Sequence, residues 1–493
     1  MSQSPQELGT APGPGFQLLL AHAEDHQPVL DQGLEVESAR EAPKPTQLPG
    51  RVEVPSWERP SASPNDLAAQ RWGVIVPEGE WGDSLLRAIT PLIEHREKEQ
   101  GGSERAPAAR FRVPPGQGAA AAVKWRNEVL RAIPERERPK YLLILGDLHH
   151  VSLELQQVLA HSAYVGRVHV GLPSGEPDLT GYMAYAHKVV AHETRTDREE
   201  AAHALLYTAR DGTSATELGH RLLVQQCLKV MHSRWKEQRL ALDIQEVTQT
   251  EADVQALLRA AGELRAGVML SVSHGLGAPR RGWASPEEQR EKQGALALGV
   301  DQTLTADVVR EHPFLPGGMW FCVACFGAAT PSHSAFHAWL SHLERQGIRT
   351  GNPKAVLRSL PREGERPFLS ALPQALLANK EGPLAIIGHC DLAWVSSFAK
   401  EDDPERGDAS RILSSLEMLA EGSRAGLALD ALMRSYREVN EQLMAGYQAR
   451  EDAALYDSPD PTDPVRQGHL WMLRNDLRGY LLLGDPAARL PIR

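Results

Sequence analysis

Two short apolar runs, Gly267-Val-Met-Leu-Ser-Val-Ser273 and Gly318-Met-Trp-Phe-Cys-Val-Ala324, decide the fold of this chain. Each run begins with glycine and is too short for a helix, so each predicts a buried β-strand. The first leads into His274 and Gly275, and the second leads into Cys325. Side chains just past the carboxyl ends of parallel strands face the crevice where α/β proteins bind ligands. If the two strands are neighbours, His274 and Cys325 meet in that crevice.

The pair His274 and Cys325 predicts nucleophilic catalysis. A thiol must lose its proton to attack a carbonyl carbon, and histidine is a base that can accept it near neutral pH. The backbone N–H groups of Gly275 and Cys325 are candidates for holding the oxyanion that then forms. Taken alone, each side chain is more typical of a core cysteine or a core histidine. Their joint position at two strand ends favours catalysis.

Strands and helices alternate on both sides of these two runs. Apolar residues recur with helical spacing between several strands, for example at Leu85, Ile89 and Leu92. Further strands are predicted at residues 72–77, 141–145, 164–168, 204–208, 240–247, 384–387 and 480–483. This alternation predicts an α/β fold with a mostly parallel sheet between two layers of helices.

The order of the motifs resembles that of the caspase-like cysteine peptidases, most closely the gingipain-like and CHAT-type members. His-Gly closes one strand and Ala-Cys closes the next, and about 50 positions separate His274 from Cys325, as in caspases. The stretch at residues 296–308 is similar to the one that precedes the cysteine strand in CHAT-type members. Gly484-Asp485-Pro486 is similar to the end of gingipain-like domains. The resemblance covers roughly residues 66–493.

This resemblance implies a caspase-like three-layer α/β/α fold in two subdomains. Residues 66–200 would form the non-catalytic α/β subdomain, and residues 201–493 would form the catalytic one. Residues 1–65 are rich in Pro, Glu, Gly and Ser and show little periodicity, so they predict a flexible lead-in.

Three residues are candidates for binding the substrate. Asp391 follows the strand predicted at 384–387, where caspase-like enzymes place part of the pocket for the residue before the cut bond. A carboxylate there would bind Arg or Lys through charge-assisted hydrogen bonds, although a loop carboxylate or a helix cap is an equal alternative. Asp301, on the CHAT-like stretch, is the rival carboxylate. Trp394 would form a wall of the pocket or simply pack in the core.

Composition narrows the classes of function. The net charge of −11 and the lack of a Lys/Arg-rich run argue against nucleic acid as a partner. No apolar run is long enough to span a membrane, and no export signal is recognisable, which predicts a cytoplasmic protein. Four cysteines in 493 residues do not form a disulfide framework. We find no phosphate-binding loop and no constellation of metal ligands, so we expect neither a cofactor nor a metal.

The resemblance implies a cysteine endopeptidase that cuts protein or peptide substrates through an acyl-enzyme, and Asp391 adds a preference for Arg or Lys before the bond. The lack of an export signal places it in the cytoplasm, unlike the secreted gingipains. Similar bacterial proteins suggest a role in defence or cell death, with an activating partner or an upstream protease as the trigger. The alternative is a catalytically silent caspase-fold scaffold that binds a partner protein. The presence of both His274 and Cys325 favours the enzyme.

Overall fold

The structure is a computed structural model that describes residues 15–45, 62–101, 107–172, 174–238, 243–247, 253–299, 301–347, 352–362, 364–400 and 406–493. Its centre is a ten-stranded sheet in the order β3-β2-β4-β5-β16-β15-β12-β8-β6-β7. The strands are β2 (Trp72–Pro77), β3 (Ala109–Val113), β4 (Tyr141–Leu145), β5 (Tyr164–Val168), β6 (His203–Thr208), β7 (Asp243–Val247), β8 (Gly267–Val272), β12 (Met319–Val323), β15 (Ala385–His389) and β16 (Tyr480–Gly484).

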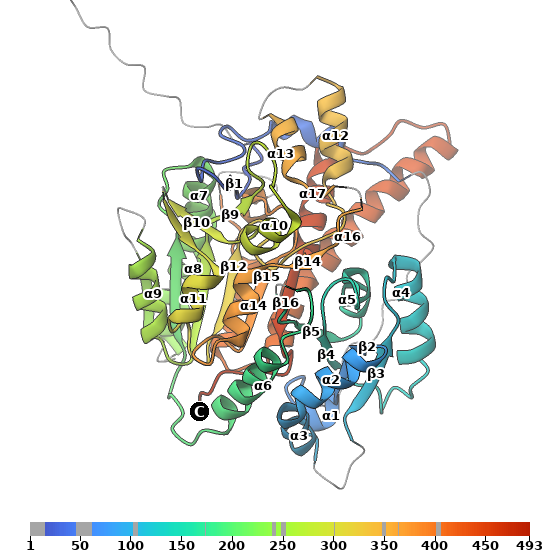
Figure 1. Cartoon of the computed structure of the whole chain (residues 1–493). Coiled ribbons are helices and arrows are strands. Elements are labelled where there is room, and N and C mark those ends of the chain that lie inside the picture. The colour runs from blue at the N-terminus through green and yellow to red at the C-terminus, as the bar shows by residue number, and fades with distance from the viewer. Residues whose placement is uncertain are drawn as a thin grey trace, which may run out of the picture.

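Most neighbours in this sheet pair in parallel, and β15 pairs with β16 antiparallel. Every residue of β4, β5, β12, β15 and β16 is buried. Successive side chains of a strand point to opposite faces, so both faces of the sheet are covered. The predicted α/β fold, a mostly parallel sheet between helical layers, is confirmed (Figure 1).

The covering helices come from the whole length of the chain. They are α1 (Leu67–Gln70), α2 (Glu80–Ala88), α3 (Thr90–Glu99), α4 (Ala119–Trp125), α5 (Leu153–Leu159), α6 (Leu179–Thr194), α7 (Ser214–Gly219), α8 (Gln225–Gln238), α9 (Val254–Glu263), α10 (Pro286–Lys292), α11 (Ala306–Glu311), α12 (His337–Arg345), α13 (Pro353–Ser359), α14 (Ala371–Ala378), α15 (Ser410–Ala420), α16 (Ala425–Leu455) and α17 (Pro464–Arg478). Among the described residues, no helix combines the length and the apolar character needed to cross a lipid bilayer.

Strand β16 joins the two halves of the sheet, since it lies between β5 and β15. Asp485, directly after β16, accepts a hydrogen bond from Nε1 of Trp72 at the start of β2 (3.0 Å). Gly484 pairs with Ala385 at the start of β15. Both halves therefore start at the same edge of the sheet, and their carboxyl ends share the opposite edge. The two predicted subdomains contribute to one sheet, and their boundary near residue 200 stays a prediction.

A second, four-stranded sheet lies at the carboxyl edge of the first. Its order is β1 (Leu20–His22), β9 (His274–Gly277), β10 (Leu296–Gly299) and β11 (Gln302–Leu304). Figure 1 shows β1, in blue, beside β9 and β10 above the large sheet. The chain thus passes from the large sheet to the small one at His274.

The prediction that residues 1–65 form a flexible lead-in is wrong for residues 15–45. This stretch carries β1 and a short 3-10 helix (Val36–Glu41), and its apolar side chains, including Leu18 and Leu20, are buried in the main core. Pro, Gly and Ser reduce the local preference for regular structure, but contacts with distant elements override that preference. Residues 1–14 and 46–61 lie outside the described residues.

Candidate functional site

Strands β8 and β12 are neighbours, as the sequence predicted, and they pair in parallel with Val272 opposite Val323. His274 and Cys325 each follow two residues later, so both emerge at the same edge. The backbone of Gly275 lies against that of Cys325: a Cβ at position 275 would stand 1.8 Å from the Cys325 carbonyl oxygen. Only glycine permits this approach, which brings the two strand ends together.

A tight turn presents the backbone N–H of Cys325. Gly327 N–H donates to the Ala324 carbonyl (3.3 Å), which places Cys325 and Phe326 at the centre of the turn. Phe326 is fully buried and has a φ of 55°, a left-handed conformation that costs a bulky residue about 1–3 kcal/mol. Such strain persists only where the surroundings enforce it, and here the enforced geometry is that of the residue after the candidate nucleophile.

The N–H groups of Gly275 and Cys325 converge on one acceptor. Both donate to the carbonyl oxygen of Leu19, at 3.0 and 3.2 Å respectively. These are the two N–H groups that the sequence predicted as holders of an oxyanion. Their convergence on a single oxygen is the arrangement that such a role requires.

The imidazole of His274 is held at one nitrogen and free at the other. Nε2 lies 2.8 Å from Thr213 Oγ1, and the hydroxyl of Thr213 donates to Asp211 Oδ1 at 2.9 Å. The Thr213 oxygen therefore accepts from the Nε2–H, which leaves Nδ1 unprotonated. Nδ1 is buried and has no hydrogen-bond partner among the described residues. A buried, unprotonated nitrogen of this kind is available to take a proton.

Burial lowers the pKa of His274, and the carboxylate of Asp211, 3.5 Å from Nε2, opposes this effect. The imidazole is therefore neutral at pH 7, the form that a general base needs.

The sequence analysis missed both Thr213 and Asp211. They follow β6, the other neighbour of β8. The polar stretch at residues 211–214, just after a strand end, was the available signal.

The thiol of Cys325 is fully buried, and its Sγ accepts the backbone N–H of Ala393 at 3.1 Å. Burial raises the pKa of this thiol, and the nearby carboxylates of Asp391 and Asp476 raise it further. The Ala393 N–H opposes the shift. In this conformation the thiol stays protonated, and a reagent from solution does not reach it.

Asp391 lies directly after β15, as predicted, and beside the Cys325 turn, where Phe326 N–H donates to its carbonyl (3.0 Å). Its carboxylate accepts backbone N–H groups of Ala335 (2.7 Å) and Leu392 (2.8 Å). Burial raises the pKa of this carboxyl. Because both oxygens already have donors, the carboxylate does not need a cation, and its role in specificity stays a prediction.

Asp301 and Trp394 occupy different settings. Asp301 is exposed in the turn between β10 and β11, with a φ of 55°. Trp394 is buried, and its ring packs edge-on against Phe16, Phe336 and Trp339. Its backbone forms a bridge with Leu18. The structure thus brings Trp394 close to the site and leaves Asp301 at the tip of a hairpin, and both substrate-binding roles stay predictions.

Away from this site, three side chains in the described part of the chain lie close enough together to bind a metal ion: His95, Glu99 and Glu193. The guanidinium of Arg96, itself fully buried, donates to both carboxylates and to Asp485. This positive charge already fills the place where a cation would bind. The cluster is an ion-pair network that ties α3 and α6 to the end of β16.

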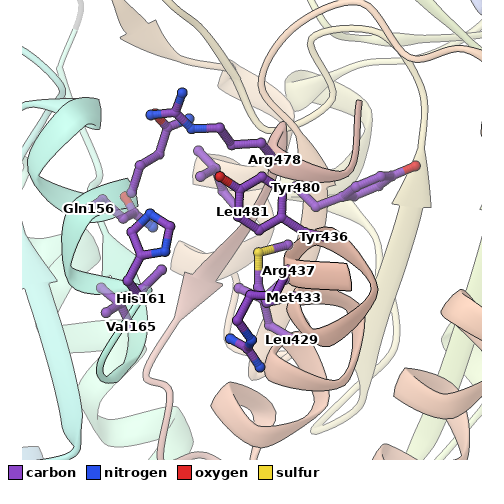
Figure 2. A pocket seen from close by; sticks show the side chains of 12 residues that line it. Gln156, His161, Val165, Leu429, Met433, Tyr436, Arg437, Arg478, Tyr480 and Leu481 are labelled. Carbon is purple, nitrogen blue, oxygen red and sulfur yellow. The ribbon is translucent and has the colours of Figure 1, made fainter. Parts of the chain in front are cut away.

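A separate small pocket lies between α5, β5, α16 and the start of β16 (Figure 2). Its volume of about 30 Å³ is enough for no more than a few water molecules. His161 points into it, and burial together with four nearby arginines lowers its pKa to about 4. The pocket is too small for a peptide and shares no lining residue with the site around Cys325.

No family model and no curated protein sequence matches this chain. Among solved structures, it is similar to a protein described as "Structure of Protease" (12% identity, TM-score 0.45, covering 85% of this chain and 78% of the other). It is also similar to the complex of the pro- and mature domains of RgpB from Porphyromonas gingivalis (11%, 0.46, 85% and 79%). The separase–securin complex from Saccharomyces cerevisiae aligns more weakly (10%, 0.30, 72% and 16%).

Proposed function

We propose that this chain is a caspase-like cysteine endopeptidase that acts on protein or peptide substrates. The observation that carries the proposal is the meeting of two adjacent strand ends. One supplies a cysteine whose N–H is presented by a strained turn, and the other supplies a histidine with a free nitrogen. A thiol, a base and two convergent N–H donors are the parts that acyl transfer needs.

In the proposed mechanism, Nδ1 of His274 takes the thiol proton, and the thiolate of Cys325 attacks the carbonyl carbon of the peptide bond. The oxygen that gains the negative charge is held by the N–H groups of Gly275 and Cys325. When the C=O bond re-forms, the C–N bond breaks, and the leaving amine takes the proton from His274. The acyl group remains on sulfur as a thioester.

Water completes the cycle. His274 removes a proton from a water molecule, whose oxygen attacks the thioester carbon. The carbon–sulfur bond breaks, an acid product leaves, and the proton returns to Cys325. Thr213 and Asp211 hold the imidazole in the tautomer that these steps require. The steps use only side chains, backbone donors and water.

The proposal includes a preference for Arg or Lys before the bond through Asp391, whose carboxylate already accepts two backbone N–H groups. A cytoplasmic setting, a trigger supplied by a partner or an upstream protease, and a role in bacterial defence or cell death stay predictions from the sequence. Binding of a partner by a silent fold is the competing function, and the burial of both reacting groups is the observation that favours it.

The test is prolonged incubation of the chain with a library of peptides, followed by mass spectrometry of the cut products. We expect cleavage that is absent in Cys325→Ala and retained in Cys322→Ala. Cys322 is a matched control because it lies on β12, the strand that leads into Cys325, and is buried in the core, where burial raises its thiol pKa to about 12. Cleavage that survives Cys325→Ala would exclude the mechanism.

A further inference from the structure

Residues 15–34, here called the N-terminal segment, cover the candidate site. His274 and Cys325 are fully buried, and so are Leu18, Leu19 and Leu20 of this segment. An enzyme that binds peptides must expose its nucleophile, so something has to leave the cleft before a substrate enters.

The segment occupies the position that the mechanism assigns to a substrate carbonyl. Leu19 C=O accepts both Gly275 N–H (3.0 Å) and Cys325 N–H (3.2 Å). A carbonyl polarised by two N–H groups beside a thiol is in the place of the bond that would be cut.

The chain binds in an extended conformation on both sides of Leu19. Before it, Leu19 N–H donates to Ala393 C=O (3.1 Å), and Val395 N–H donates to Gln17 C=O (3.0 Å). After it, residues 20–22 pair in parallel with residues 275–277. Peptide ligands commonly bind enzymes and receptors in this way, by adding a strand to an exposed edge.

Further contacts hold the N-terminal segment in place. Arg280 forms an ion pair with Asp25 (2.7 Å), and its backbone N–H donates to Glu24 (2.8 Å). The Leu20 side chain packs against Gly277, where a Cβ would come within 2.7 Å of its Cδ1. Covalent attachment adds a high effective concentration, so a free peptide competes poorly with this segment.

We infer that residues 17–22 lie in the substrate cleft as a substrate would, with Leu19 in the place of the residue before the cut bond. The cleft then takes extended peptides with a leucine-like apolar residue at that position, and the N-terminal segment slows cleavage by the intact chain to the rate at which the segment is transiently displaced. This inference rests on the proposed function, and it competes with the preference for Arg or Lys predicted from Asp391.

The first test opens the cleft in the full-length chain with Leu20→Asp. An unpaired carboxylate against Gly277 disfavours docking of the segment. We expect iodoacetamide to alkylate Cys325 at least about tenfold faster than in the unmodified chain, as local opening becomes more frequent. Cys227, Cys322 and Cys390 are also buried, and their protection shows that the rest of the fold is intact. Unchanged labelling of Cys325 would overturn the inference.

A second variant changes an exposed residue, so its outcome does not depend on whether the core tolerates a charged side chain. Arg280→Asp removes an exposed ion pair and places like charges beside Asp25 and Glu24, so labelling of Cys325 should rise a few fold. Adding Asp25→Arg restores an opposite pair and should slow the labelling again. If Leu20→Asp exposes all four cysteines, these two charge variants provide the test instead. Equal rates of Cys325 labelling in the unmodified chain, in Arg280→Asp and in the double variant would overturn the inference.

The specificity is tested on the Leu20→Asp chain with peptides that copy residues 15–22 and differ only at the position of Leu19. We expect the Leu peptide to be cut at least about tenfold faster than peptides with Arg or Asp there. A preference for Arg would overturn the apolar assignment and support Asp391. Rapid labelling without cleavage of any peptide would refute the proposed function but leave the occupied cleft standing. Equal cleavage by the intact and opened chains would support the proposed function but refute the inference that the N-terminal segment occupies the cleft.

Discussion

The two halves of the large sheet end in polar clusters of opposite character. In the first half, the guanidinium of Arg167 is fully buried, and it donates to Gln156 and to the carbonyls of Gly146, Asp147 and Ser152. All of its hydrogen-bonding nitrogens have partners. Such a cluster fixes the ends of β4 and β5 and leaves no group free for chemistry.

In the second half, the strand ends leave polar groups unpaired. His274 Nδ1 and Ser273 Oγ are buried without partners among the described residues, and Phe326 holds a strained backbone. Native proteins rarely keep such groups unless a function retains them. The comparison teaches that two clusters at the same edge of one sheet can serve stability in one case and reactivity in the other.

The largest effect is expected when the reactive groups of the second half are removed. In the Leu20→Asp background, Cys325→Ala and His274→Ala should each lower the rate of peptide cleavage by at least about a thousandfold, because nucleophile and base act together. The unfolding temperature should change by only a few degrees. Steady-state kinetics and thermal unfolding measure the two quantities, and a rate within tenfold of the parent would remove the residue from the mechanism.

The matching change in the first half should affect stability alone. Arg167→Met leaves three carbonyls and the Gln156 side chain without their donor, and since each buried unpaired group costs about 1–3 kcal/mol, the free energy of unfolding should fall by at least about 3 kcal/mol. Cleavage per folded molecule should stay unchanged. Urea unfolding checks the loss, and Arg110→Met, at a half-exposed position on β3, serves as the control. A stable Arg167→Met protein would show that the cluster is dispensable.

The loss of stability at low pH should also distinguish the two halves of the sheet. His169, directly after β5, is partly buried, and this burial lowers its pKa to about 4. The unfolded chain binds the proton near pH 6.5, so this residue makes stability fall as the pH drops from about 6.5 toward 4, by about 2 kcal/mol at pH 5. His169→Gln should flatten this decline in urea unfolding at pH 7 and pH 5, whereas exposed His337→Gln should not. An equally steep decline in both variants would contradict the assignment.

The smallest expected effect concerns Thr213, which acts through His274. Thr213→Val removes the acceptor of the Nε2–H, so the rate of cleavage should fall about tenfold, the value of one hydrogen bond. The pH profile should shift with it, since the tautomer is no longer fixed. Thr213→Ser keeps the hydroxyl and should restore both rate and profile. Loss of rate in the serine variant as well would point to packing rather than to positioning.

The strands, and the emergence of residues 274 and 325 at one edge of the sheet, could be predicted because each follows from a short stretch of sequence. Short apolar runs bounded by glycine predict buried strands, and the carboxyl ends of adjacent parallel strands fall at one edge. The boundaries of β2, β4 and β5 were predicted without error.

The rest depends on contacts between distant residues. Nothing near Thr213 in the sequence shows that its hydroxyl meets an imidazole 61 positions later. Asp391 was expected to need a cation because the N–H of Ala335, 56 positions away, could not be foreseen as its partner. The apolar run at residues 16–21 is short and lies in a Pro-rich stretch, so only the structure reveals that it fills the cleft.

The placement of β16 sets the order in which this chain can assemble. Residues 480–484 pair with β15 and lie beside β5, so the ten-stranded sheet is not continuous until these residues have been synthesised. Before that point, contacts outside the sheet, such as those of Lys188 with the carbonyls of Leu376 and Leu377, can join the two groups of strands. Each group of strands can begin to fold as it emerges, since its connections are local. The N-terminal segment, which emerges first, must wait for residues 275 and 393 before it can dock. During synthesis, the piece that closes the cleft is therefore available before the cleft exists.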